Sequence, residues 1–318
     1  MVDESVEEHA SSVRDRAVGA LVGLAVGDAV GTTLEFKPRD SYEHITDMVG
    51  GGPFGLEPGQ WTDDTSMALC LADTLLEKGQ VDQTDLMGRF VRWWRQGENS
   101  STGTCFDIGK TTSSALLSFE RSGEPVAGST HERSAGNGSL MRLAPVAVLY
   151  HRSRVDAETA ARAQSVTTHA APAAVDACGY FAGLLVNAIN GKAEQELLRP
   201  EKIEGAEEVQ VVAAGSWRDK RRDEIRSTGY VIHTLEAALW SVANSGSFEE
   251  AVLLAANLGD DADTVAAVTG QLAGALWGTG SIPEDWKRRL TWGDTITEKA
   301  CALFDVGRSK NLGEALCR

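Results

Sequence analysis

Several features are scarce in this sequence, and each scarcity excludes a class of protein. No apolar stretch reaches the roughly 18–20 uninterrupted residues of a transmembrane helix. The acidic start, MVDESVEEHA, lacks the basic-then-apolar order of a signal peptide. The five cysteines are dispersed (Cys70, Cys105, Cys178, Cys301, Cys317), and an odd number at such spacing is typical of reduced thiols. These features predict a cytoplasmic protein without a membrane span.

Basic residues are also outnumbered, because 30 Lys and Arg stand against 46 Asp and Glu, for a formal net charge of −16. Sequence-independent binding to nucleic acid needs clustered Lys and Arg, so this function class is not expected. Hydrophobic residues make up 42% of the 318 positions, which is enough for a folded core. Most of the acidic excess is interpreted as a soluble surface, although a polyanionic ligand held through metal ions and backbone N–H groups stays compatible with it.

Alternating, β-branched strand patterns are nearly absent, and the short VQVVA segment at 209–213 is the best candidate for one. Apolar and small residues instead recur at three- and four-residue spacing, which predicts a tightly packed helix over 14–34. A second helix is expected to open with WTDDTSMALCLADTLL. Further helical patterns cover about 82–96, 107–121, 138–150, 155–168, 172–190, 228–244, 248–256, 263–277, 283–291 and 294–306. The sequence therefore predicts an all-α protein.

The chain shows no boundary between independently folded units. Segment 191–226 does not resemble a Pro-, Ser- or Gly-rich linker, and no repeat of fixed period is present, so a single domain over residues 1–318 is expected. Residues 1–12 are expected to be flexible. Segment 191–226 is charge-rich and irregular, and it is interpreted as a surface excursion or a capping subdomain.

Two acidic clusters, almost two hundred positions apart, each end a loop and open an apolar helix. They are Thr62-Asp63-Asp64-Thr65 and Asp260-Asp261-Ala262-Asp263-Thr264. Helix capping uses one carboxylate or two, whereas each cluster crowds like charges that are unfavourable unless a cation neutralises them. All the side chains offered are hard oxygens, which favours Mg²⁺ or Mn²⁺ over Ca²⁺ and Zn²⁺. Two such helix starts facing each other could hold two ions.

Four other features are weaker candidates when each is taken alone. The segment 135–142 (AGNGSLMR) leads into a helix, where glycines let the backbone approach a phosphate or a hydroxyl, although Gly-Asn-Gly is also ordinary turn chemistry. Asp107, near a helix start, is either a cap or a third acidic contribution. His169 ends a helical pattern, where a lone histidine is more often structural. Glu35 closes the first helix, where a surface role is the plain alternative.

In their order along the chain, these segments resemble the ADP-ribosylglycohydrolase family, which is typified by dinitrogenase reductase-activating glycohydrolase. The matching segments are GDAVGTTLEF (27–36), GQWTDDTSM (59–67), CFDIGKTT (105–112), AGNGSLMRLAPV (135–146), TTH (167–169), GYVIHTLEAALW (229–240) and GDDADTVAAVTGQLAGALWG (259–278). One such match is weak, whereas the ordered set over about residues 14–280 is specific. The chain departs from the family at residues 259–264, where relatives often have the sequence GGDTDT. Here Asp260 replaces a Gly and Ala262 replaces a Thr.

The resemblance implies a compact orthogonal bundle of helices with two divalent ions, Mg²⁺ or Mn²⁺, at the base of a cleft. The implied metal ligands, with Glu35 close by, are Thr62, Asp63, Asp64, Asp261, Asp263 and Thr264. The residues implied to lie along ADP-ribose are Asp107, Gly136, Asn137, Gly138, Ser139, Met141 and His169, with Tyr230 at the adenine. The candidate catalytic carboxylates are Glu35, Asp63, Asp64 and Asp107, and the sequence does not choose the general base among them.

The activity implied is metal-dependent hydrolysis of the glycosidic bond between ADP-ribose and a modified protein, with ADP-ribosylarginine as the favoured substrate. The CFDIGKTT segment looks more like the arginine-directed branch of the family. Three alternatives stay open: hydrolysis of O-linked ADP-ribose on serine or in a polymer, a catalytically silent ADP-ribose-binding relative, and a dinuclear phosphoesterase. The physiological target, the preferred metal and the oligomeric state are left open by the sequence.

Overall fold

Two helices from opposite ends of the chain lie in backbone contact in the computed structural model, which describes the backbone of residues 4–316 and the side chains of residues 12–309. They are α1 (Glu4–Gly31) and α12 (Ala262–Trp277), and they run antiparallel. Glycines recur every four residues on one face of α1, each against a small residue of α12. The pairs are Gly19–Gly274, Gly23–Gly270, Gly27–Ala266 and Gly31–Ala262.

The separation of α1 and α12 leaves no room for side chains between them. A Cβ atom added to Gly23 would lie 2.2 Å from the carbonyl oxygen of Gly270, and one added to Gly27 would lie 2.1 Å from that of Ala266. Distances this short are not tolerated between carbon and backbone oxygen. The glycine and alanine density of 14–34 therefore has a packing reason, since only these residues allow the two helices to touch.

The remaining helices pack around this pair. They are α2 (Asp63–Lys78), α3 (Gln83–Gln96), α4 (Lys110–Ser122), α5 (Ala144–Leu149), α6 (Arg154–Ser165), α7 (Pro172–Ile189), α8 (Glu194–Leu197), α9 (Glu207–Ala213), α10 (Val231–Ala243), α11 (Phe248–Ala256), α13 (Glu284–Arg289) and α14 (Gly293–Leu316). Four 3₁₀ turns join them: η1 (Thr32–Leu34), η2 (Glu132–Ser134), η3 (Arg222–Glu224) and η4 (Thr279–Ser281). Residues 4–316 contain isolated β-bridges but no strand, so the all-α prediction is confirmed.

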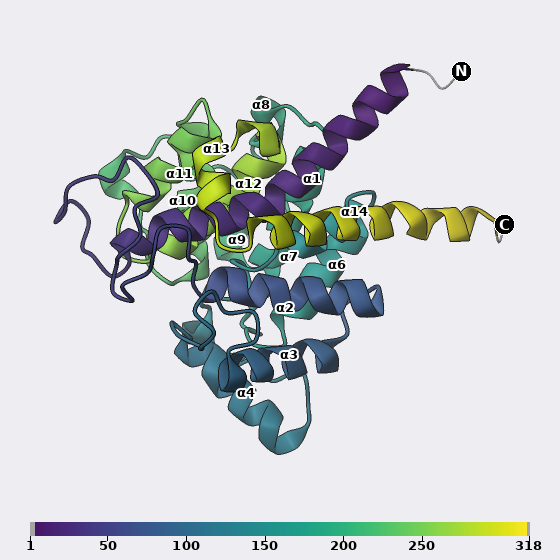
Figure 1. Cartoon of the computed structure of the whole chain (residues 1–318), viewed down its shortest axis with the longest axis horizontal. Helices are drawn as coiled ribbons and strands as arrows, with labels where there is room; N and C mark the ends of the chain where they lie inside the picture. Colours follow the sequence, from purple (N-terminus) through teal and green to yellow (C-terminus); the bar gives the residue numbers. More distant parts are fainter. Residues whose placement is uncertain (1–3, 317–318) are drawn as a thin grey trace.

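The arrangement has α1 and α12 at its centre. Helices α7, α10 and α11 contact α12, whereas α5 and α14 contact α1. Figure 1 shows α14 (yellow) beside α1 (purple), with α2, α3 and α4 stacked in succession on one side of the molecule. The core between these helices is built from fully buried side chains such as Leu21, Leu24, Phe181, Phe248 and Leu272.

Two helices have the length and apolar composition of a membrane span, and both lie inside the fold. They are the stretch Ser12–Leu34 and helix α7, whose most apolar windows are 100% and 78% buried. Their composition is accounted for by burial against the other helices, because the core helix of a folded protein meets the same criterion.

Two segments differ from the sequence pattern. Helix α5 begins only at Ala144, since the residues before it form turns in which the N–H groups of Leu140 and Met141 both donate to the carbonyl of Asn137. Segment 191–226 holds α8 and α9, and VQVVA at 209–213 lies in the helix α9. Its side chains Val212 and Trp217 are buried. For the expected flexible start, residues 1–12, the side chains of 1–11 lie outside the described residues.

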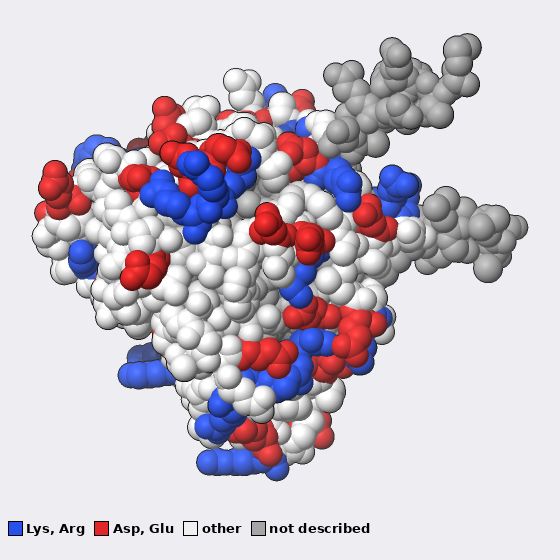
Figure 2. All heavy atoms as spheres, in the orientation of Figure 1, with Lys and Arg blue, Asp and Glu red and all other residues white. Residues whose placement is uncertain are grey.

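The surface carries both signs of charge close together. On the face drawn in Figure 2, acidic and basic side chains lie next to one another, and the largest blue area, in the upper part of the view, is bordered by red. Ion pairs among the described residues include Arg92 with Glu98 and Arg95 with Glu120, at 2.6 and 2.7 Å. Neighbouring acidic side chains weaken the attraction of such basic groups for a polyanion.

We predict that Gly23→Ala lowers the free energy of unfolding by about 3 kcal/mol, because the new methyl group forces α1 away from α12. Urea denaturation followed by circular dichroism measures the change. The control is Gly88→Ala in the interior of α3, where an added Cβ meets only the flexible end of Arg92 at 3.7 Å. That substitution should raise the free energy of unfolding by up to about 1 kcal/mol, since alanine favours helix over glycine. Equal effects would contradict the packing described here.

Candidate metal centre and ligand pocket

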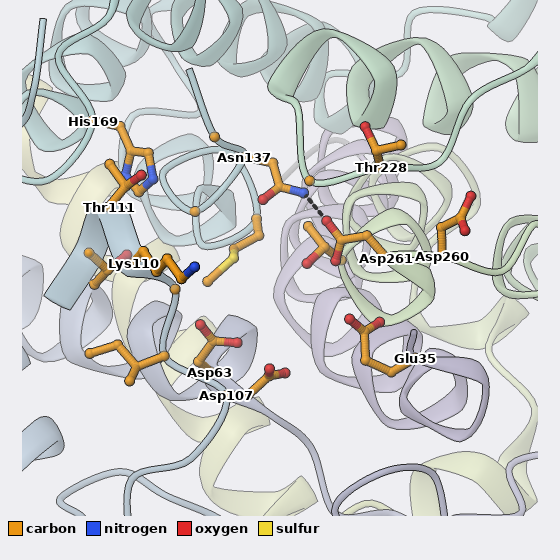
Figure 3. A pocket seen from close by; sticks show the side chains of 18 of the residues that line it. Glu35, Asp63, Asp107, Lys110, Thr111, Asn137, His169, Thr228, Asp260 and Asp261 are labelled. Carbon is orange, nitrogen blue, oxygen red and sulfur yellow. Dashed lines mark hydrogen bonds between the residues drawn. The ribbon is translucent and has the colours of Figure 1, made fainter. Parts of the chain in front are cut away.

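A pocket of about 660 Å³ opens where several helix ends meet. Its volume is in the range of small-molecule sites. Its walls come from the ends of α1, α2, α4 and α12 and from the loops before α5 and α10. The predicted site residues that line it are Glu35, Asp63, Asp107, Gly136, Asn137, Gly138, Met141, His169, Asp261 and Thr264. In Figure 3, Lys110, Thr111 and His169 lie on one side, Glu35, Asp260 and Asp261 on the other, and Asp63 and Asp107 between them.

The N-terminus of α2 is held in place by Asp28, a fully buried carboxylate on α1. Asp28 accepts hydrogen bonds from the N–H groups and the hydroxyls of both Thr62 and Thr65, at 2.6–3.1 Å. These four donors fix the first turn of α2 against α1. The next residues of that turn, Asp63 and Asp64, are thereby carried to the base of the pocket.

Helix capping does not explain the two acidic clusters. Thr62 and Asp261 occupy the N-cap positions of α2 and α12, yet neither side chain accepts a hydrogen bond from its own helix. By contrast, the caps Asp82 of α3 and Ser153 of α6 accept from the N–H group three residues on. Thr62 and Asp261 therefore do not cap their helices with their side chains.

The oxygen atoms of the two clusters converge. The Thr62 hydroxyl lies 2.9 Å from Asp28, 3.2 Å from Asp263 and 3.5 Å from Asp64, although it has only one hydrogen to donate. One carboxylate oxygen of Asp64, Oδ1, is buried without a hydrogen-bond partner. Such an oxygen is costly unless a positive partner compensates it.

A second group of oxygens lies beside the first. Glu35, Asp261 and Asp263 each offer a carboxylate oxygen, and these atoms all lie within 4.8 Å of one another. Asp261 is oriented by Asn137, whose amide donates to it at 2.6 Å and to Thr234 at 2.9 Å. The Thr264 hydroxyl lies 3.4 Å from Asp64 and links the two groups. An all-oxygen set of this kind suits a hard divalent cation such as Mg²⁺ or Mn²⁺.

The carboxyl groups of the cluster have raised pKa values, which indicates that too little positive charge surrounds them. Burial, and after it the negative charge of Asp263, raises the pKa of Asp28 and of Asp261 to about 7. Burial and the charge of Asp63 raise the pKa of Asp107 to about 11. The pKa values of Glu35 and Asp63 are also raised well above their ordinary range, chiefly by burial and by Asp263. These carboxylates need protons or a cation when they are packed together.

The opposite wall of the pocket combines an uncharged imidazole with one positive charge, that of Lys110. Gly138 lies against the His169 ring, so that a Cβ atom there would come within 2.7 Å of the ring carbon Cε1. Burial, together with the charge of Arg142, lowers the pKa of His169 to about 3, which keeps the imidazole uncharged. Among the described residues that line the pocket, Lys110 is the only Lys or Arg. It stands at the first turn of α4.

Five predicted site residues lie outside the pocket lining. Thr62, Asp64 and Asp263 are buried beneath it among the converging oxygens. Ser139 is fully buried behind the wall, where its hydroxyl accepts from Ser165 at 2.8 Å. Tyr230 lies beside the pocket and lines a neighbouring cavity of about 440 Å³.

Backbone strain is concentrated at this site. Phe36, Asp107 and Asp260 line the pocket and have φ angles of 60°, 59° and 58°, in the left-handed region that side chains disfavour. The described chain has only three other non-glycine residues of this kind, Asp40, Asn99 and Trp292. Such conformations persist where the surrounding structure imposes them, and they gather at functional sites.

Two residues of the site were not selected from the sequence, Asp28 and Lys110. Asp28 had a detectable signal, because it is a charged residue inside an otherwise small and apolar helical stretch. Lys110 had none, since a lysine at a helix start is ordinary and only the folded chain turns it toward the pocket.

Comparison with known proteins gives consistent results. The model of the family described as ADP-ribosylglycohydrolase matches residues 9–312. The chain is 51% identical to "ADP-ribosylarginine hydrolase Tri1" of Pseudomonas putida, and the match covers 92% of this chain and 78% of that protein. It is 49% identical to the protein of the same name from Serratia proteamaculans, and that match covers 91% of this chain and 79% of the relative. It is 32% identical to "ADP-ribosyl-[dinitrogen reductase] glycohydrolase" of Rhodospirillum rubrum over 88% and 91%.

A solved structure agrees with the sequence comparisons. It is described as an "ADP-ribosylglycohydrolase-related protein complex" and is 41% identical to this chain. It superposes with a TM-score of 0.84 over 93% of this chain and 99% of its own.

We predict that Asp28→Asn lowers the free energy of unfolding by at least about 2 kcal/mol, because an amide cannot accept from all four donors of α2. Thermal and urea denaturation measure the loss. As a control, Asp285→Asn changes an exposed aspartate paired only with exposed groups. It should stay within about 0.5 kcal/mol of the parent protein. A stable Asp28→Asn protein would show that this carboxylate does not anchor α2.

We also predict that the metal-free protein loses stability as the pH rises from about 5 to about 7.5. The pKa values of Asp28 and Asp261 lie near 7 in the folded protein and near 4 when unfolded, so the folded state binds more protons in this window. The measurement is chemical denaturation at several pH values with chelator and with Mn²⁺. Saturating Mn²⁺ should flatten the pH dependence, and identical curves with and without the ion would contradict a metal centre here.

Proposed function

Because the chain belongs to the ADP-ribosylglycohydrolase family, we propose that it releases ADP-ribose from ADP-ribosylarginine on protein, with two Mg²⁺ or Mn²⁺ ions as cofactors. The observation that carries the proposal is the converging set of buried oxygens at one end of a ligand-sized pocket. The arginine linkage is supported by the two relatives that are about half identical to this chain and are named ADP-ribosylarginine hydrolases.

The side chains proposed to hold the ions come from three elements. They are Glu35 after α1, Thr62, Asp63 and Asp64 at the start of α2, and Asp261, Asp263 and Thr264 at the start of α12. Bound divalent ions lower the pKa of water and orient hydroxyl groups of a substrate. The fit of these residues is supported by the unpartnered Oδ1 of Asp64 and by the raised pKa of this carboxyl, which is caused first by burial and then by the neighbouring carboxylates.

Hydrolysis at an anomeric carbon needs a carboxylate that accepts a proton from the attacking water and negative charge near the oxocarbenium-like centre. Glu35, Asp63 and Asp107 line the pocket and can reach such a water, whereas Asp64 is fully buried beneath it. This location favours the first three as proton acceptors.

The other wall suits the ADP moiety. The Lys110 ammonium offers a positive charge to a diphosphate, and the free N–H groups of the first turn of α4 add to it. Gly136 and Gly138 let the backbone approach a ligand closely beside the neutral His169 ring. Tyr230, at the neighbouring cavity, is placed to meet an aromatic base beyond this wall.

The test is product release from an ADP-ribosylarginine protein with Mg²⁺, with Mn²⁺ and with chelator, followed by mass spectrometry. We expect intact ADP-ribose only when metal is present. Asp63→Ala and Asp261→Ala should lower the rate by at least about 100-fold and weaken metal binding while the circular dichroism spectrum is kept. Release of AMP or phosphate would indicate a phosphoesterase instead. Full activity in either variant would refute the dinuclear model.

A further inference from the structure

Three phenylalanines from separate segments lie in contact, and one of them, Phe36, lines the pocket. Phe36 follows the first helix and its 3₁₀ turn, Phe54 lies in the glycine-rich loop before α2, and Phe106 lies in the loop before α4. The ring centroids of Phe36 and Phe54 are 6.3 Å apart with the rings near perpendicular, and those of Phe54 and Phe106 are 5.1 Å apart. We call this group the aromatic strip.

Phe36 occupies a position that folding alone does not favour. Its backbone is left-handed, with φ at 60°, where glycine or asparagine is preferred over an aromatic residue. Its side chain is 64% exposed, so it gains little from burial. The backbone is held in this conformation by a 2.7 Å hydrogen bond from the Phe36 N–H to the carbonyl of Asp260. A residue with a disfavoured backbone conformation and a largely exposed aromatic side chain contributes little to stability, so it is a candidate for a role in binding.

Phe54 is presented by a tight and well-defined turn. Gly51 and Leu56 exchange two backbone hydrogen bonds at 2.7 and 2.9 Å, which closes a hairpin with Phe54 in its loop. Gly52 and Gly55 in this loop have positive φ angles. A Cβ atom on Gly52 would lie 2.1 Å from the carbonyl oxygen of Thr32, so the hairpin is pressed against the end of the first helix. The glycines of this loop thus fix Phe54 beside Phe36.

The strip borders the acidic end of the pocket. Phe36 lines the pocket and directly follows Glu35, and Phe106 directly precedes Asp107. Lys110 and His169 lie on the opposite side. If the ADP moiety occupies that opposite side, as the proposed function has it, the bond to be cleaved lies among the carboxylates. The group that leaves must then pass the aromatic strip.

We propose that the aromatic strip binds the guanidinium of the modified arginine and thereby selects arginine as the leaving group. A guanidinium is a planar, weakly hydrated cation that stacks on aromatic faces. The hydroxyl of a serine leaving group offers neither a flat face nor a charge, so the strip favours arginine over serine. This inference rests on the proposed function.

The test compares Phe36→Asn, Phe54→Leu and Phe106→Leu with the parent protein on an ADP-ribosylarginine peptide. Leucine keeps the apolar volume and removes the aromatic face, and asparagine accepts the left-handed backbone at position 36. We expect KM to rise between about 2-fold and about 30-fold, the range of a cation–π contact. The affinity for free ADP-ribose, measured by calorimetry, should change by less than about 2-fold. Phe36→Asn should not lower the melting temperature.

The matched control is Phe119→Leu, which makes the same chemical change on α4 away from the pocket lining. It should leave KM unchanged. An unchanged KM in Phe36→Asn and Phe54→Leu, in folded proteins that bind ADP-ribose normally, would overturn the inference and leave the proposed function intact. An equal rise of KM on an ADP-ribosylserine peptide would also overturn it. If the parent protein releases no ADP-ribose from the arginine peptide, the proposed function itself fails, and this inference with it.

Discussion

The backbone contact between α1 and α12 is the constraint on which the site depends. Because Gly23 and Gly27 place α1 directly against Gly270 and Ala266, the two helices run antiparallel at the smallest separation that their backbones allow. The end of α1 and the start of α12 therefore meet. This meeting carries Asp28 and Glu35 to the side of Asp261 and Asp263, more than two hundred residues later in the chain.

The acidic cluster destabilises the folded protein, and interactions with the rest of the fold compensate part of that destabilisation. Two helix N-termini, those of α2 and α12, point their partial positive charges at the carboxylates. Asp28 is satisfied by four donors, and Asp261 is held by Asn137. The compensation is incomplete, since Asp64 keeps an oxygen without a partner. This imbalance makes the cluster a candidate binding site for cations, because the described side chains alone do not neutralise its charge.

The two walls of the pocket differ in charge and in chemical character. One wall, with Lys110 and the uncharged His169, suits a phosphate-bearing ligand, and the other gathers the carboxylates. The aromatic strip borders the carboxylates, and one of its residues, Phe36, lines the pocket. Under the proposed function, the part of the substrate common to all ADP-ribosylated proteins and the part that differs among them would meet separate surfaces. The proposed choice of leaving group then depends on residues that do not touch the ADP moiety.

The sequence by itself determined the class of fold, and ten of the residues that it predicted for the site line one pocket. Helical periodicity with almost no strand pattern predicted an all-α chain, and twelve of its helices were located, because burial of one face leaves a repeating signal. The two clusters at 62–65 and 260–264 were readable as hard-cation ligands, since crowded carboxylates exceed what capping needs. The short helices α8 and α9 were missed, because they lie in the charge-rich segment 191–226, where apolar residues show no clear helical period.

What the sequence left undetermined was decided by tertiary structure. That Asp28 anchors α2, that Ser139 faces away from the pocket, and that Lys110 faces into it depend on how helices cross, which no local pattern encodes. The aromatic strip joins three segments that share no motif. Spacing along the chain specifies which residues share a helix face, whereas contacts between distant segments arise only when the helices pack.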